Sequence, residues 1–262
     1  MMKKSNFALK LSDFVIVKHN KILNKMEIQE LEKMIREKES TLSLAFPALM
    51  RKVYVWMTLA LIITAVTAYG VAHSPALLNL IYYNKITFFG LIIAELALVF
   101  WVSARIEKLS LTSATLLFIL YSAINGATLS AIFIMFSATA ITKTFLITAC
   151  TFAVMAVYGY FTKQDLSSMG KILLMALIGL IIAGLVNLFM RSNTMDLIVS
   201  GLGVLIFVGL TAYDSQKIKQ MLAMQTDMGE GAQKVALMGA LSLYLDFINL
   251  FLYLLRFFGS RE

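Results

Sequence analysis

The sequence is poor in the residues that mark several common protein classes. It has one cysteine, two prolines and two histidines among 262 residues. A disulfide-stapled secreted module and a cysteine-rich zinc scaffold each need several sulfurs, so both classes are excluded. The two histidines, His19 and His73, lie outside the long apolar runs. A zinc-dependent membrane hydrolase would therefore lack its ligands.

Charged residues are also scarce. They make up 15 % of the chain, against about 25 % in soluble domains, while 60 % of the residues are hydrophobic. This composition argues against an ordinary soluble enzyme. The net charge is +8, from 23 basic and 15 acidic residues. Such an excess is typical either of polyanion-binding proteins or of membrane proteins with asymmetric loops, and the positions of the charges decide between them.

Seven apolar runs are long enough to cross a bilayer as helices, which takes about 20 residues each. They are apolar on every face, whereas the strands of an outer-membrane barrel alternate in polarity. We predict an all-α polytopic membrane protein, with a charged, partly helical tail over residues 1–50 and a seven-helix domain over residues 51–262. The predicted spans are 53–72, 86–104, 111–136, 144–161, 172–190, 197–213 and 235–258.

The basic residues are distributed unequally between the two sides of this topology. The tail and the second, fourth and sixth loops hold 18 Lys and Arg residues, and the other side holds 5. Because basic residues resist translocation, the N-terminus is predicted to be cytoplasmic. The excess charge is then topological, and lipid rather than nucleic acid is the expected partner.

Ionisable residues in the spans are functional candidates, because a charge at mid-bilayer costs about 2.5–3.5 kcal/mol. Glu95 lies midway along the second span and Asp246 midway along the seventh. Arg105, Asp214 and Arg256 lie at span ends.

The seventh span carries a polar stripe that a lipid-facing helix would not tolerate. At 100° per residue, five polar residues fall on one side of it. They are Ser242, Asp246, Asn249, Tyr253 and Arg256. We therefore predict that the seventh helix is central and surrounded by the other six. A purely structural seam that ties helices together is the alternative interpretation.

The predicted topology places Arg105 and Asp214 in one leaflet, with Asp246 one or two turns deeper. Two close carboxylates in a poorly solvated site cannot both ionise freely, so they share a proton, and a nearby Arg opposes this sharing. These three residues are a candidate pH-set latch. Ca²⁺ takes about 6–8 oxygen ligands, so Asp214 and Asp246 would bind it only weakly and transiently. No other cofactor is expected.

At two places the sequence resembles the signatures of the Bax inhibitor-1 family. These are residues 210–216, LTAYDSQ, and residues 240–251, ALSLYLDFINLF. Further support comes from residues 95–100, 103–106 and 120–126, and the resemblance covers about residues 45–260. It implies a seven-helix bundle around the last helix.

The resemblance also implies a function, a pH-sensitive Ca²⁺ leak controlled by Asp214 and Asp246. Arg105 is then the latch partner, and Glu95 could pair with Arg256 across the bundle. Bacterial relatives are linked to inhibition of a membrane-bound ATP-dependent protease, and eukaryotic relatives to suppression of cell death. We expect a multi-pass protein of the bacterial inner membrane.

Two other functions are also consistent with the sequence. A non-conducting regulator would dock to a membrane protease or another membrane protein. An intramembrane aspartyl protease also carries Tyr-Asp on one helix and Asp on the next, but its Gly-x-Gly-Asp motif is replaced here by residues 243–246, LYLD. A flexible glycine pair before the second aspartate is therefore missing, and we expect no catalytic residues.

Overall fold

The structure is a computed structural model, and it describes residues 29–34, 36, 45–225 and 227–259. The chain divides into two compact units, residues 1–47 and residues 48–262. In the first unit, residues 29–34 and 36 are helical, and their side chains are exposed. The rest of the predicted tail up to residue 44 lies outside the described residues.

In the described part of the chain, seven helices are long and apolar enough to cross a membrane. The predicted fold class, an all-α polytopic membrane protein, is confirmed. The first span is Ala45–Ala72. The elements that follow are α2 (Pro75–Leu78), the π-helix η1 (Asn79–Tyr83), α3 (Lys85–Arg105), α4 (Leu111–Leu129), α5 (Ile132–Met135), α6 (Ala138–Phe161), α7 (Ser167–Met190), α8 (Asn193–Ala223) and α9 (Glu230–Phe258). The third span combines α4 and α5.

Four of the long helices begin where a polar side chain accepts hydrogen bonds from the free backbone N–H groups of the first turn. Asn84 caps α3, Ser110 caps α4, Ser137 caps α6 and Ser192 caps α8. At the end of α7, Arg191 takes a left-handed conformation with φ of 51°. This turn lets α8 begin two residues later.

Several helices extend beyond the apolar runs that predicted them. The sixth span was predicted to end at residue 213, but α8 continues to Ala223. Hydropathy detects only the apolar part of a helix. The final turns of α8 carry polar side chains such as Gln216 and Lys219, which form hydrogen bonds with the end of α6 and the loop after it. These bonds stabilise the helix past its apolar part.

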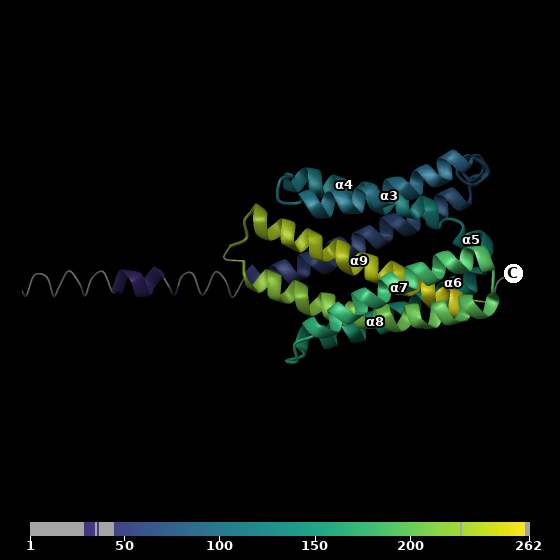
Figure 1. Cartoon of the computed structure of the whole chain (residues 1–262). Helices are drawn as coiled ribbons and strands as arrows, with labels where there is room; N and C mark the ends of the chain where they lie inside the picture. Colours follow the sequence, from purple (N-terminus) through teal and green to yellow (C-terminus); the bar gives the residue numbers. More distant parts are fainter. Residues whose placement is uncertain (1–28, 35, 37–44, 226, 260–262) are drawn as a thin grey trace, which may run out of the picture. The chain divides into compact units, whose positions relative to one another are not determined.

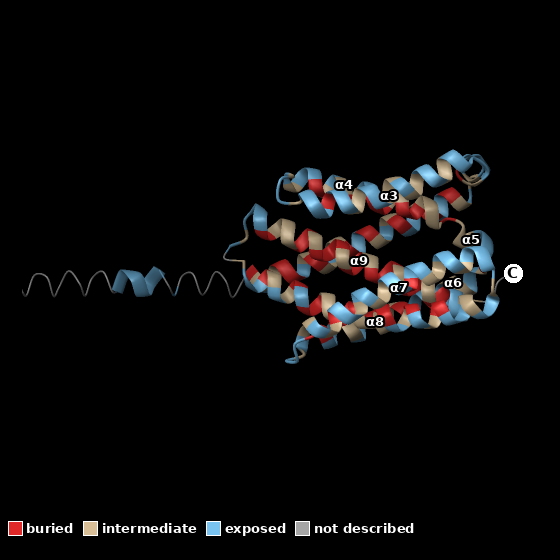
Figure 2. Cartoon of the chain, viewed as in Figure 1, coloured by how far each residue is buried: buried red, intermediate tan, exposed pale blue. Residues whose placement is uncertain are grey.

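The last helix is the most buried of the seven, as predicted. In α9, 67 % of the apolar window is buried, against 6 % in α3 and in α7. It packs against α4, α6 and α8 and forms a hydrogen bond with the first span. The outer helices pack elsewhere, α3 chiefly on α4 and α7 chiefly on α8. Figure 1 shows the long helices of this unit running side by side, and Figure 2 shows the buried residues along α9.

Candidate functional site

Two aspartates on neighbouring helices lie within electrostatic reach of each other. Asp246, at the middle of α9, is 5 % exposed. Its carboxylate oxygen Oδ2 is buried without a hydrogen-bond partner in the described part of the chain. Asp214 comes from α8 and is close enough for its charge to act directly on Asp246. The structure thus brings together the two carboxylates that the sequence singled out.

Close contacts between α8 and α9 define how the aspartates are aligned. The helices run antiparallel, with Gly239 beside the Ile218 side chain and Gly203 beside the Tyr253 ring. This register places Asp214 roughly one turn of about 5.4 Å from the level of Asp246, toward the start of α9. The two carboxylates therefore lie at positions about one turn apart along the axes of the two helices.

The α8 aspartate is held in place by the two residues that follow it. Ser215 donates a hydrogen bond to the backbone oxygen of Ala156 in α6, at 2.8 Å. The Gln216 side chain accepts from the backbone N–H of Leu166 at 2.8 Å and donates to the backbone oxygen of Gln164 at 2.7 Å. These bonds fix this part of α8 to α6 and to the loop after it.

Charges of the opposite sign near the pair are few. Lys217 is the cation whose charge reaches Asp214. It is exposed and lies 5.7 Å from the centre of the Tyr213 ring. Asp246 faces the like charge of Asp214. The described residues contain no group of three or more His, Cys, Asp or Glu that could hold a metal ion. Two carboxylates supply at most about four of the 6–8 oxygens that Ca²⁺ prefers.

Arg105 lies apart from the aspartate pair. It is exposed at the C-terminal end of α3, a helix that packs chiefly on α4 and η1. The predicted topology gave only a shared leaflet for Arg105 and Asp214. A shared leaflet does not make two helices neighbours, and the structure does not bring this arginine to the pair.

Glu95 and Arg256 are also held by other partners. Glu95 accepts a hydrogen bond of 2.6 Å from the Thr128 hydroxyl on α4. Arg256 is exposed, with its guanidinium 5.7 Å from the centre of the Tyr253 ring. The pairing of Glu95 with Arg256 is therefore not present in this structure.

The remaining members of the polar stripe on α9 take different surroundings. Ser242 and Asn249 are half-buried, and Asn249 donates to the backbone oxygen of Leu245 in its own helix. Tyr253 and Arg256 line a polar groove of about 860 Å³. The groove lies between the end of α7, the start of α8 and the end of α9. The stripe thus runs from the aspartate pair toward a polar opening at one end of the bundle.

A second buried polar cluster was missed by sequence reasoning. The Tyr244 hydroxyl lies 3.0 Å from Asn125 Oδ1 and 2.6 Å from the Thr64 hydroxyl. The Thr64 hydroxyl also lies 2.9 Å from the backbone oxygen of Ser122. Each hydroxyl has one hydrogen to donate, so two of these three contacts are hydrogen bonds at any one time. The cluster joins α9, α4 and the first span. Asn125 and Tyr244 are neutral, so a search for intramembrane charges passes over them, although an asparagine in mid-span was a usable signal.

Comparison with known proteins gives a consistent set of matches. The model of the family described as "Inhibitor of apoptosis-promoting Bax1" matches residues 47–262. The inner membrane protein YbhL of Escherichia coli (strain K12) is 51 % identical over 214 residues, which cover 81 % of this chain and 92 % of YbhL. A protein of Borreliella burgdorferi is 47 % identical over 211 residues, covering 80 % and 91 %. A membrane protein of Streptococcus pyogenes serotype M1 is 41 % identical over 186 residues, covering 71 % and 80 %.

Proposed function

The chain belongs to the Bax inhibitor-1 family, and on that premise we propose that it is a pH-sensitive Ca²⁺ leak controlled by Asp214 and Asp246. The observation that carries the proposal is the buried Asp246 oxygen without a hydrogen-bond partner, beside a second carboxylate. A buried polar atom without a partner is costly. Such an atom is expected at a site where a ligand binds during function. A pair of carboxylates can bind either a proton or a cation.

The proposed control follows from the charge on the pair. When the pair shares a proton, the two carboxyl groups can lie close together between α8 and α9. Loss of that proton leaves two negative charges in a medium of low dielectric constant, where their repulsion is strong. A divalent cation relieves this repulsion, so deprotonation favours entry of Ca²⁺. Few protein oxygens are available, so the ion binds weakly and passes on.

The proposal also includes the membrane that holds the protein and the side on which its N-terminus lies. We place the protein in the bacterial inner membrane, because YbhL is named as an inner membrane protein. The N-terminus is placed in the cytoplasm, because 18 of the 23 basic residues lie on that side of the seven spans. No catalytic residue is part of the proposal.

Purified protein in liposomes with an enclosed Ca²⁺ reporter tests the leak, with the pH varied between about 6 and 8. We expect Ca²⁺ flux above that of empty liposomes. The flux should rise with pH, because deprotonation of the pair favours entry of Ca²⁺. Asp246→Asn and Asp214→Asn should each abolish the pH response. Asp165→Asn, a change of an exposed loop carboxylate, is the matched control and should keep it.

Two outcomes would overturn the proposal in different ways. Flux equal to that of empty liposomes at every pH excludes conduction. The second candidate then stands, a non-conducting regulator that binds a membrane-bound protease or another membrane protein. A pH response that survives both aspartate substitutions keeps the leak but rejects the pair as its sensor.

A further inference from the structure

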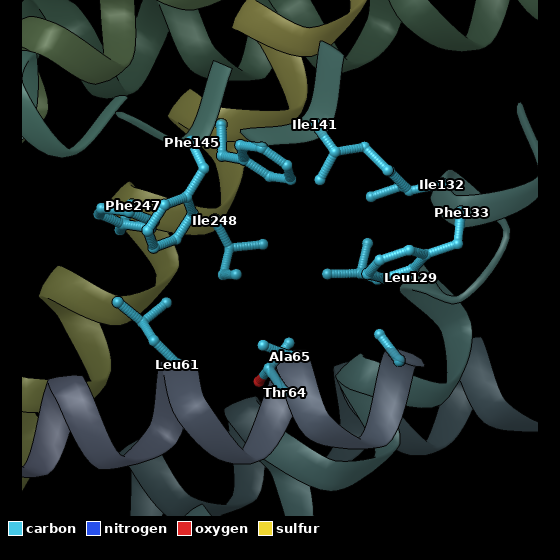
Figure 3. Close-up of a pocket in the computed structure, with 12 residues that line it drawn as sticks. Leu61, Thr64, Ala65, Leu129, Ile132, Phe133, Ile141, Phe145, Phe247 and Ile248 are labelled. Atoms are coloured by element: carbon cyan, nitrogen blue, oxygen red, sulfur yellow. The ribbon is translucent and has the colours of Figure 1, made fainter. Parts of the chain in front are cut away.

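An apolar crevice lies between helices that do not close on one another. It has a volume of about 100 Å³, and Figure 3 shows the side chains of the first span, α4, α5, α6 and α9 around it. We call it the crevice and define it by six of its lining residues. They are Ala65 and Ala68 of the first span, Leu129 of α4, Ile141 and Phe145 of α6, and Phe247 of α9.

The walls of the crevice offer almost nothing to a polar ligand. Thr64 is the one residue among those lining it whose side chain carries a polar atom. Its hydroxyl is already bonded to the Ser122 backbone oxygen and to the Tyr244 hydroxyl. Apolar cavities of about 150 Å³ stay dry and bind hydrocarbon or xenon. A crevice of this size and chemistry therefore suits a short stretch of hydrocarbon.

The crevice opens to the outside of the bundle, the side that would face lipid in a bilayer. Ala65 and Phe145 at its rim are exposed. Ala65 lies seven residues before the end of the first span, and Phe145 seven residues after the start of α6. Both are thus about 10 Å from a helix end at 1.5 Å per residue. At that depth a bilayer presents acyl chains.

We propose that the crevice binds the acyl chain of a membrane phospholipid, which fills the space between the first span and α6. The chain would contact Phe247 on the inner wall. Phe247 directly follows Asp246 in α9, so a bound acyl chain supports the helix that carries the aspartate. The proposal concerns lipid binding and does not depend on ion conduction.

Quenching of tryptophan fluorescence by brominated phosphatidylcholine in nanodiscs tests this site. The two native tryptophans, Trp56 and Trp101, are replaced by Phe, and a single reporter is introduced as Phe247→Trp. The control reporter is Phe207→Trp, because Phe207 is equally buried, at 5 % against 4 % exposed, but does not line the crevice. We expect strong quenching at position 247 and several-fold weaker quenching at position 207.

A second pair of variants tests whether the brominated chain reaches position 247 through the crevice. Ala65→Leu at the rim should relieve the quenching at position 247. Ala97→Leu, the same change at an exposed position of α3, should leave it unchanged. If Phe247→Trp does not fold, Phe251→Trp serves as the reporter, since Phe251 also lines the crevice.

The proposal is overturned if position 247 is quenched no more than position 207, or if Ala65→Leu has no effect. Nanodiscs of unbrominated lipid with added brominated fatty acid distinguish the source of the chain. Quenching by the fatty acid alone, without quenching by the brominated phospholipid, also rejects a phospholipid site.

Discussion

Two buried polar residues on α9 lie only two positions apart but differ in how they are satisfied. The hydroxyl of Tyr244 has hydrogen-bond partners on α4 and on the first span. The Oδ2 atom of Asp246 has no partner in the described part of the chain. Residues two apart on a helix point in directions about 200° apart. The two side chains therefore face different neighbours. We call the side of α9 that carries Tyr244 the satisfied face, and the side that carries Asp246 the unsatisfied face.

The difference distinguishes the face of α9 that has a structural role from the face to which we assign the proposed function. Around Tyr244, every group of the cluster has a partner within the bundle, so this face needs nothing from outside and holds the helices together. Around Asp246, the ionisable group whose charge acts on it is Asp214, which carries a like charge. In the proposed function, a proton or a cation binds at this face. Substitutions on the first face should change stability, and those on the second should change the response to pH.

The largest loss of stability is expected from Gly126→Leu, next to Asn125 on α4. A Cβ at this position would lie 2.5 Å from the backbone oxygen of Thr64. A leucine would push the first span away from α4 and break the Thr64 hydrogen bonds, at a cost of about 1–3 kcal/mol or more. Unfolding in mixed detergent and dodecyl sulfate micelles measures this loss. Gly179→Leu is the control, because nothing lies within 4 Å of a Cβ at position 179, and equal losses in both variants would contradict the prediction.

A smaller loss is expected from Tyr244→Phe, which removes one hydroxyl and leaves the ring. Asn125 Oδ1 loses its donor and Thr64 loses a partner. Interhelical hydrogen bonds in membrane proteins contribute about 1 kcal/mol, and we expect a loss of that size by the same unfolding measurement. Tyr158→Phe, at an exposed tyrosine on α6, should have no effect. A Tyr244→Phe variant as stable as the parent would show that this cluster does not hold the bundle together.

On the unsatisfied face, Asp246→Asn should leave stability unchanged or raise it. Asparagine keeps the shape of the side chain but cannot become charged. Close carboxylates repel each other when both are ionised, so the parent should become less stable than the variant as the pH rises from about 5 to about 8. The difference should shrink toward acid pH, where the pair retains a proton. Unfolding curves at several pH values measure it, and a difference that does not vary with pH would show that the pair does not titrate.

The sequence predicted the helices well and their neighbours poorly, for physical reasons. Apolar length alone identifies a span, because hydrocarbon accepts few other structures. The polar stripe on the last span identified α9 as the central helix, because lipid would not solvate Asp246. Hydropathy did not reveal that Tyr244 and Asn125 meet, since the partner of a neutral polar group depends on which helices pack together. Because packing information was lacking, a shared leaflet was enough to make Arg105 the candidate latch partner of Asp214.

The smallest effect is therefore expected from Arg105→Gln. Arg105 is exposed at the end of α3, and exposed charges contribute little to stability, about 0–1 kcal/mol. In the arrangement of helices described here, its charge does not reach the aspartate pair, so both stability and the pH response of Ca²⁺ flux should match those of the parent. Lys217→Gln is the informative counterpart, because the charge of Lys217 does reach Asp214, and its loss should shift the pH response. A response altered by Arg105→Gln but not by Lys217→Gln would mean that α3 reaches α8 in a second conformation, and that the arginine acts there as a latch.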